Sequence, residues 1–335
     1  MAFRILALSG GGFLGLFSAQ VLANLEKKSG RPIGEGFDLI AGTSIGGVIA
    51  LGLALGIPAA SIRDAFEARG AQIFSARSKP SGAFATFVDF ASRYLFTAKY
   101  RAEGLRSALV DMFGSGTLLG HAKHPVIVPT VNMTRGEIQF FKTPHHINFS
   151  RDHLLSVVDV AMATAAAPTY FPLANVGDWL CADGGLFANS PDLCAVHEAV
   201  EFLGAKRSEV EVLSIGTTTA KFSLSHRLGG NFGAWQWMSS GKLISSMLSS
   251  QQQMTDHILR HELGDRYIRI DELQSEYQSR DLGLDVATPE AQKTIRGLAD
   301  GATQKALVNP KLDEFLNAAA RRPLFFFGPR RFDQV

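Results

Sequence analysis

The chain has few of the residues that would mark a disulfide-bonded or nucleic-acid-binding protein. Its 335 residues include only two cysteines, Cys181 and Cys194, which lie outside any CxxC spacing. We therefore expect free thiols in a reducing compartment. The 33 lysines and arginines nearly balance the 31 aspartates and glutamates, for a formal charge of +2. Such a balance provides no general attraction for a nucleic-acid polymer, so none is expected as a partner.

The sequence also lacks a convincing signal peptide or membrane span. After Arg4 the only apolar run before the first glycines is Ile5–Leu8, which is too short for the apolar part of a secretion signal. The segment Leu39–Ala60 carries no charge and is long enough to cross a bilayer. Its glycines and Pro58 favour instead a strand, a tight turn and a buried helix. A cytoplasmic protein is predicted.

Short apolar runs alternate with helical segments in the first 55 residues, which predicts a parallel sheet between helices. The expected order is strand Phe3–Leu8, turn Gly10–Gly15, helix Leu16–Lys28, strand Phe37–Ala41, turn Gly42–Gly46 and helix Gly47–Leu55. Further strands are predicted at Pro125–Val131 and Glu137–Lys142, as a hairpin, and at Val210–Ile215. Because the last of these strands lies beyond Asp183, we expect the sheet to continue past that residue and the chain to form one domain over residues 1–335. In that domain residues 196–335 complete the globule begun by the motif-bearing core, residues 5–195.

Two later segments have apolar residues at helical spacing. Phe84, Phe87, Phe90 and Tyr94 predict an amphipathic helix within residues 81–100, and a second such stretch covers Trp235–Leu259. Packing of these side chains on the core is the favoured interpretation. A lipid-facing cap is the alternative.

A glycine-rich loop, Ser9–Gly15, is placed between the first strand and the first helix. Its glycines allow backbone amides to point at an anion, aided by the positive end of the following helix. Gly10, Gly12 and Gly15 also fit the dinucleotide pattern GxGxxG. That pattern requires an acidic residue near the end of the second strand, where this chain has Ala41 and glycine. The nucleotide interpretation is weakened accordingly.

The segment Gly42-Thr43-Ser44-Ile45-Gly46 is a GxSxG motif between an apolar strand and an apolar helix. This is the context of a nucleophile elbow, in which flanking glycines relieve crowding around an outward-facing serine. A serine that merely caps the helix is the alternative. The glycine-rich loop upstream favours Ser44 as a nucleophile.

A serine nucleophile needs a base, and Asp183-Gly184-Gly185 offers one after an apolar stretch. An ordinary turn is the competing interpretation of these three residues. A Ser, acid, His order would suit another class of hydrolase, in which one histidine after Asp183 would be the base. The candidates, none within a recognisable motif, are His197, His226, His257 and His261.

Three histidine pairs have spacings that a metal could use, but no HExxH pattern accompanies them. We therefore expect neither a metal nor a cofactor. The pairs are His121 with His124, His145 with His146, and His257 with His261.

Four ordered blocks together resemble the patatin-like phospholipase family: SGGG at 9–12, GTSIG at 42–46, ATAAAPTYFP at 163–172 and DGG at 183–185. The resemblance implies a three-layer α/β/α fold and hydrolysis of membrane phospholipid esters by a Ser-Asp dyad without histidine. It assigns Ser44 as nucleophile and Asp183 as general base, with the amides of Gly10, Gly11 and Gly12 holding the oxyanion. The remaining motif positions are Gly15, Gly42, Gly46, Gly184 and Gly185.

Two positions depart from the pattern of many family members, which have aspartate before the three glycines and arginine later in the loop. This chain has Ser9 and Leu14. The oxyanion amides belong to the backbone and are unaffected, but the bracing that the arginine would give is absent. A missing oxyanion donor costs about 10²–10³ in rate, so a poorly set loop would leave a slow enzyme or an inert binding protein.

The C-terminal part resembles, more loosely, bacterial anti-phage (CBASS) effectors of the same family. That resemblance implies activation by a cyclic dinucleotide or trinucleotide and peripheral association with the inner face of the membrane, and it leaves homo-oligomerisation open. It rests on residues 213–218, on Trp235–Met254 with three consecutive glutamines, and on Arg266–Asp271.

The C-terminal tail combines four arginines with Phe325, Phe326, Phe327 and Phe332. These residues would suit a membrane anchor, through charge and inserted rings. Packing of the rings on the protein body is the slightly favoured alternative, because adjacent exposed rings promote aggregation.

Overall fold

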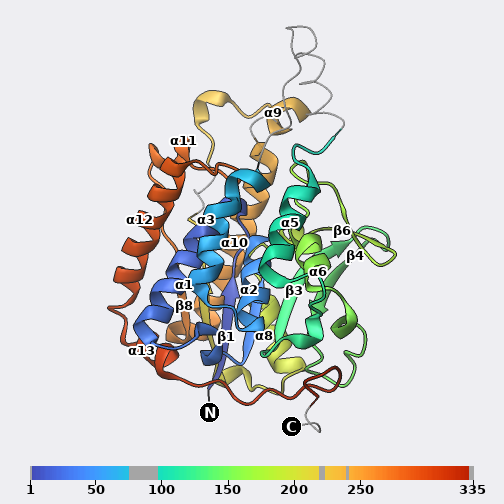
Figure 1. The fold of residues 1–335 in the computed structure, drawn as a ribbon. Helices are drawn as coiled ribbons and strands as arrows, with labels where there is room; N and C mark the ends of the chain where they lie inside the picture. Colours follow the sequence, from blue (N-terminus) through green and yellow to red (C-terminus); the bar gives the residue numbers. More distant parts are fainter. Residues whose placement is uncertain (1, 75–96, 219–222, 239–240, 332–335) are drawn as a thin grey trace.

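A mixed, mainly parallel sheet occupies the centre of the molecule (Figure 1). The structure is a computed structural model that describes residues 2–74, 97–218, 223–238 and 241–331. Across the sheet the strand order is β5-β6-β3-β2-β1-β7-β8, and β4 pairs with β3. The strands are β1 (Phe3–Leu8), β2 (Leu39–Gly42), β3 (Val126–Asn132), β4 (Glu137–Lys142), β5 (Ala174–Val176), β6 (Trp179–Asp183), β7 (Val210–Ile215) and β8 (Tyr267–Ile270).

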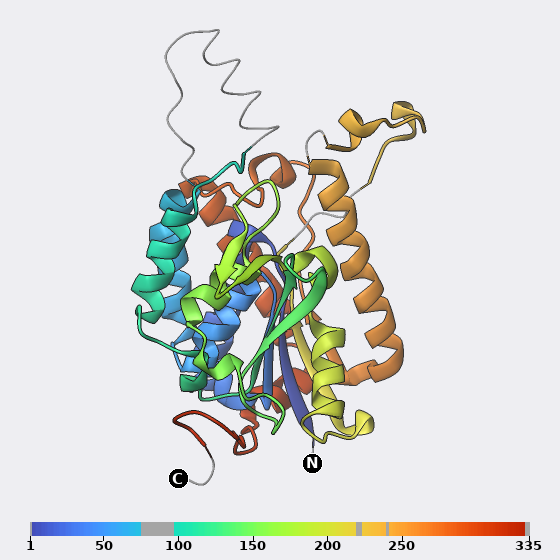
Figure 2. The same cartoon turned by 90° about the vertical axis from the view of Figure 1, so that its right-hand side faces the viewer.

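Helices cover both faces of the sheet, as Figure 2 shows from the side. One face packs against α1 (Gly15–Ser29), α2 (Ile45–Leu55), α3 (Ala59–Ile73), α5 (Ala102–Phe113), α6 (Val157–Thr164), α12 (Pro289–Ala306) and α13 (Pro310–Asn317). The other face packs against α8 (Asp192–Glu201) and α10 (Lys242–Leu263). Shorter helices are α7 (Gly185–Ala188), α9 (Ala234–Met238) and α11 (Gln278–Asp281).

Strand β1 shows why the sheet needs both layers. Leu6 and Leu8 point into the larger apolar core, whereas Ile5 and Ala7 point into the smaller one. All four side chains are fully buried, as expected for a parallel strand covered on both faces. The predicted α/β fold with a mainly parallel sheet and flanking helices is confirmed.

Several predicted elements agree with the structure to within a few residues. The hairpin is present as antiparallel β3 and β4, and β7 spans the predicted residues. The first helix begins at Gly15, directly after a short 3-10 turn, Gly12–Leu14. The helix predicted within residues 81–100 falls mostly outside the described residues, including its four aromatic positions. The stretch from Trp235 is described as two helices, α9 and α10.

The C-terminal tail packs on the protein body, so the membrane-anchor interpretation of its three adjacent rings is wrong. Phe325 is buried, and the amide of Phe326 donates a 2.8 Å hydrogen bond to the carbonyl oxygen of Pro144. The ring of Phe327 stacks on His153 with centroids 5.8 Å apart. Phe332 lies outside the described residues. Across the described ranges, no helix is both long and apolar enough to pass through a bilayer.

Candidate active site

Ser44 lies at the turn between β2 and α2, at the carboxyl end of the parallel strands. Its backbone has φ 54° and ψ −125°, a strained conformation for a residue with a side chain. The turn is held because the amide of Ser44 donates a 2.9 Å hydrogen bond to Oγ1 of Thr164. A strained serine between strand and helix is the geometry expected of a nucleophile elbow.

Gly46 shows why the motif requires glycine after the serine. A Cβ at this position would lie 2.3 Å from the carbonyl oxygen of Leu8 and 2.6 Å from that of Ser9. The start of α2 therefore lies directly against the end of β1. Any side chain at Gly46 would push the elbow away from the glycine-rich loop.

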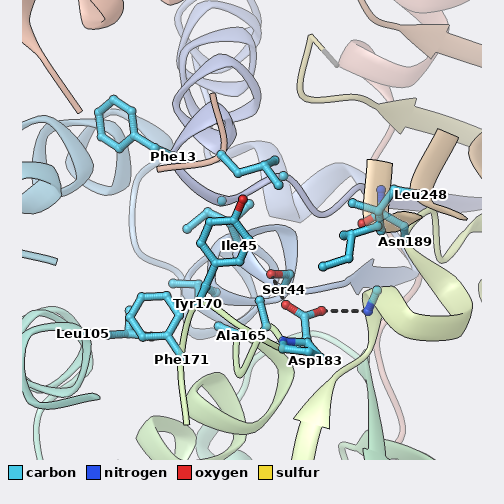
Figure 3. A pocket seen from close by; sticks show the side chains of 18 of the residues that line it. Phe13, Ser44, Ile45, Leu105, Ala165, Tyr170, Phe171, Asp183, Asn189 and Leu248 are labelled. Atoms are coloured by element: carbon cyan, nitrogen blue, oxygen red, sulfur yellow. Dashed lines mark hydrogen bonds between the residues drawn. The ribbon is translucent and has the colours of Figure 1, made fainter. Parts of the chain in front are cut away.

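Asp183 ends β6 and points toward Ser44 (Figure 3). Strand β6 runs antiparallel to β3, which pairs with β2, and this places the end of β6 beside the elbow. The hydroxyl of Ser44 donates a 2.6 Å hydrogen bond to Oδ2 of Asp183. Oδ1 accepts a 2.7 Å hydrogen bond from the amide of Gly185. Hydrogen bonds therefore fix the orientation of both carboxylate oxygens.

Burial controls the charge of this carboxyl group. Asp183 is almost inaccessible to solvent, and desolvation raises its pKa from 3.8 to about 6. The hydrogen bonds from Ser44 and Gly185 lower the pKa and offset part of that effect. Near neutral pH the carboxyl group is mainly ionised, and its proton affinity is higher than that of an ordinary aspartate. Both properties suit a general base.

An apolar cavity of about 120 Å³ opens above Ser44 and Asp183. In Figure 3, Tyr170 and Phe171 lie on one side of the pair and Leu248 on the other. The lining residues come from α2, α3, α5, α10 and the loops around them, and include no lysine, arginine or histidine. Such a lining suits a hydrocarbon chain attached to an ester at Ser44.

Two of the three loop glycines predicted to hold the oxyanion, Gly11 and Gly12, line this cavity. The amide of Gly10 donates a 2.9 Å hydrogen bond to the carbonyl oxygen of Asn189, so it is already used. Gly11 and Gly12 both line the cavity, and their amides make no hydrogen bond within the described residues. The candidate oxyanion donors are therefore Gly11 and Gly12.

The loop is braced by residues that motif analysis did not identify. Oγ1 of Thr217, after β7, donates a 3.0 Å hydrogen bond to the carbonyl oxygen of Gly10. The hydroxyls of Ser9 and Ser190 are 3.0 Å apart and buried. The side chain of Leu14 is buried in the apolar core, where the arginine of other family patterns would carry a charge.

A buried arginine approaches the loop from the sheet side. Arg269 of β8 donates hydrogen bonds of 2.8 Å to Oγ of Ser214 and 2.7 Å to Oδ2 of Asp271. Its guanidinium also reaches Oγ of Ser9 at 3.5 Å. A fixed cation thus lies below the first residue of the loop although position 14 has none. No sequence signal marked this role, because it depends on pairing between distant strands.

Histidine is absent from the lining of the cavity although the sequence contains nine. The rings of His257 and His261 face each other within α10, and His145 is hydrogen-bonded to Glu198. Among the described residues, no cluster of three or more histidine, cysteine or acidic side chains could hold a metal ion. The geometry offers Ser44 one base, the carboxylate of Asp183.

Comparison with known proteins agrees with this geometry. A family model described as patatin-like phospholipase matches residues 6–192. The chain is 43% identical over 333 residues to a cGAMP-activated phospholipase of Pseudomonas aeruginosa (strain BWHPSA011 / Pa011), covering 98% of this chain and 96% of the relative. It is 35% identical over 344 residues to a cGAMP-activated phospholipase of Vibrio cholerae serotype O1, covering 95% of this chain and 96% of the relative. A cGAMP-activated phospholipase of Escherichia coli (strain TW11681) is 32% identical over 345 residues, covering 95% of this chain and 94% of the relative.

Proposed function

Because the chain belongs to the patatin-like phospholipase family, and is therefore a lipid ester hydrolase, we propose that Ser44 and Asp183 form its catalytic dyad. The observation that carries this proposal is the 2.6 Å hydrogen bond from Oγ of Ser44 to Oδ2 of Asp183. It supplies the nucleophile and base contact that serine catalysis requires. The substrate would be a membrane phospholipid, with one acyl chain in the apolar cavity.

In the acylation step, Oγ of Ser44 attacks the ester carbonyl carbon while its proton passes to Oδ2 of Asp183. The amides of Gly11 and Gly12 donate hydrogen bonds to the carbonyl oxygen as it gains negative charge. When the carbon–oxygen bond to the leaving group breaks, Asp183 returns the proton to the departing alcohol. The products of this step are a lysophospholipid and an acylated Ser44.

Water completes the cycle by the same route. Asp183 accepts a proton as water attacks the acyl carbonyl carbon, and it returns that proton to Oγ of Ser44 as the fatty acid leaves. One carboxylate therefore serves as base and acid in both halves of the reaction. The two-step scheme requires no metal or cofactor.

We also infer that a cyclic dinucleotide activates the enzyme and that it acts as a peripheral protein at the membrane surface. The names of three relatives, each covering nearly the full chain, support the activator. A bilayer would be the source of a phospholipid substrate.

The test measures fatty acid release from phospholipid vesicles by the wild type, Ser44→Ala and Asp183→Asn, each with and without cyclic GMP–AMP. We expect a rise in the wild type on adding the nucleotide, and losses of several orders of magnitude in both variants. The double variant should be no slower than the slower single variant, because the two residues act as a unit. Labelling of Ser44 by a fluorophosphonate would report the activated serine directly. Retained turnover in Asp183→Asn, with loss in a histidine variant, would replace the dyad with a Ser-His-Asp arrangement.

A further inference from the structure

The C-terminal tail forms one wall of a second cavity. The tail runs along the end of the molecule at which β1 begins (Figure 1). This cavity has a volume of about 620 Å³, within the range of small-molecule sites. Its polar lining consists of His121, Lys123, Arg322 and Arg330, and the remaining lining residues are proline and phenylalanine. Among residues 2–74, 97–218, 223–238 and 241–331, no carboxylate lines it.

Contacts with the protein body hold the segment that carries the two arginines, whose side chains are themselves exposed. Phe325, between them in sequence, is buried, and Phe326 is hydrogen-bonded through its amide to Pro144. The chain then turns at Gly328, which has φ 81°. Nε of Arg330 donates a 3.0 Å hydrogen bond to the carbonyl oxygen of His121. The tail is therefore a fixed strap that presents Arg322 and Arg330 on one cavity.

Within the described ranges, no carboxylate neutralises the charges of this cavity. Lys123, Arg322 and Arg330 form no ion pair with any carboxylate of the described residues. The neighbouring Arg321, in contrast, lies 3.9 Å from the carboxylate of Glu209. Cations of one sign held together repel each other, and a bound anion would relieve that repulsion.

The catalytic cavity is unsuitable for such an anion. Its lining includes no cationic side chain, and it already contains the carboxylate of Asp183. A phosphodiester placed there would lose its hydration without a compensating charge. An anionic activator therefore needs another site, and the basic cavity supplies what the apolar one lacks.

We propose that the basic cavity formed by Lys123, Arg322 and Arg330 binds a cyclic dinucleotide through its two phosphodiester groups. The inference rests on the proposed activation by such a nucleotide. Planar guanidinium groups suit phosphodiester oxygens because they donate paired hydrogen bonds to them. The proline surfaces of the cavity offer apolar contact to the bases.

The cavity also touches the helix that begins at the nucleophile. A Cβ on Gly56, which caps the end of α2, would lie 2.5 Å from Nζ of Lys123. The amide of Lys123 is hydrogen-bonded to the carbonyl oxygen of Ala54 in the same helix. Ser44 caps the other end of α2. An anion that draws Lys123 into the cavity would therefore act on the helix that positions Ser44.

The experiment measures binding of cyclic GMP–AMP by calorimetry to the wild type, Arg322→Ala, Arg330→Ala and the double variant. Arg321→Ala is the matched control, because it removes the same charge from the same strap but does not line the cavity. We expect the Kd to rise at least about tenfold for each cavity arginine and to change little for the control. The nucleotide concentration for half-maximal vesicle hydrolysis should rise in parallel, while hydrolysis of a soluble short-chain ester without nucleotide stays unchanged.

Several results would overturn the site. Two concern the variants: an unchanged Kd in the double variant, or a loss of affinity in Arg321→Ala equal to that of the cavity variants. Two concern the wild type: no nucleotide binding, or competition by inorganic phosphate or anionic vesicles that is as effective as competition by unlabelled nucleotide. Because calorimetry does not depend on turnover, failure of the dyad would appear separately, as lost hydrolysis in a protein that still binds.

Discussion

The side chain of Thr164 links the amide of Ser44 to the carbonyl oxygen of Pro129. Its Oγ1 accepts a 2.9 Å hydrogen bond from the Ser44 amide and donates a 2.7 Å hydrogen bond to the Pro129 carbonyl oxygen. Thr164 thus ties the elbow to β3, and it belongs to the ATAAAPTYFP block whose role was open. The hydroxyl is buried and satisfied on both sides.

Replacing Thr164 by valine should therefore misplace Ser44 without changing the size of the side chain. The buried amide of Ser44 and the carbonyl oxygen of Pro129 would each lose their hydrogen-bond partner, which costs about 1–3 kcal/mol of folding free energy for each group. We expect kcat on a short-chain ester to fall at least about tenfold while KM changes little. Thr294→Val, a half-buried position on α12 whose hydroxyl bonds only within its own helix, is the control and should behave as the wild type. Wild-type kcat in Thr164→Val would contradict this role.

The pKa of Asp183 predicts an acid limb in the activity profile. Because burial raises this pKa to about 6, the carboxylate base is progressively protonated below that pH. The value of kcat/KM for a soluble ester should fall about tenfold per pH unit on the acid side. Stopped assays between pH 4.5 and 8 would test this, with fold monitored by circular dichroism. A fall in kcat/KM that begins only near pH 4 would show that burial does not raise the pKa of the catalytic carboxyl group.

The same carboxylate should destabilise the fold above its pKa. The folded protein holds this proton more tightly than the unfolded chain, so stability due to Asp183 is lost as pH rises from about 4 through about 6. The loss is on the order of 3 kcal/mol. Asp183→Asn should therefore raise Tm relative to the wild type, more at pH 7.5 than at pH 4.5. Calorimetric scans of both proteins at the two pH values provide the measurement. An equal difference in Tm between variant and wild type at both pH values would refute the prediction.

Arg269 should affect turnover through the glycine-rich loop rather than through substrate binding. Lysine at this position keeps the charge but cannot reach Ser214, Asp271 and Ser9 together. We expect Arg269→Lys to lower kcat about tenfold with little change in KM. Arg260→Lys, an exposed ion pair within α10, is the matched control. A fall in Tm with kcat unchanged would assign Arg269 to stability alone.

The strap predicts opposite results for two adjacent residues. Phe325 is 3% exposed and Leu324 is 58% exposed. Phe325→Ala should destabilise the fold by about 3–5 kcal/mol, whereas Leu324→Ala should leave Tm nearly unchanged. Thermal unfolding compares them directly. An unaltered Tm in Phe325→Ala would show that the ring of Phe325 does not pack on the protein body.

The local pattern indicated Ser44, which lies between Gly42 and Gly46 after an apolar strand, whereas the choice of Asp183 depended on the resemblance of four ordered blocks to one family. Contacts that depend on the order of strands in the sheet could not be predicted from the sequence. Thr217 reaches Gly10 only because β7 pairs with β1, and Asn189 occupies the amide of Gly10 from a separate segment. The ring cluster at Phe325–Phe327 was ambiguous for another reason. Three adjacent apolar residues have no period, so burial was only slightly favoured over membrane insertion.

The pairing of β1 with β7 also affects when the active site can form during synthesis. Phe3 is in register with Val210, and the brace from Thr217 to Gly10 lies just beyond that strand. The ribosome must therefore add about two hundred residues after β1 before the glycine-rich loop can be held, which takes roughly 10–40 s at bacterial elongation rates. Until then the nascent chain has its nucleophile sequence but no assembled oxyanion loop. The fold therefore delays assembly of this loop until translation is well past the motifs themselves.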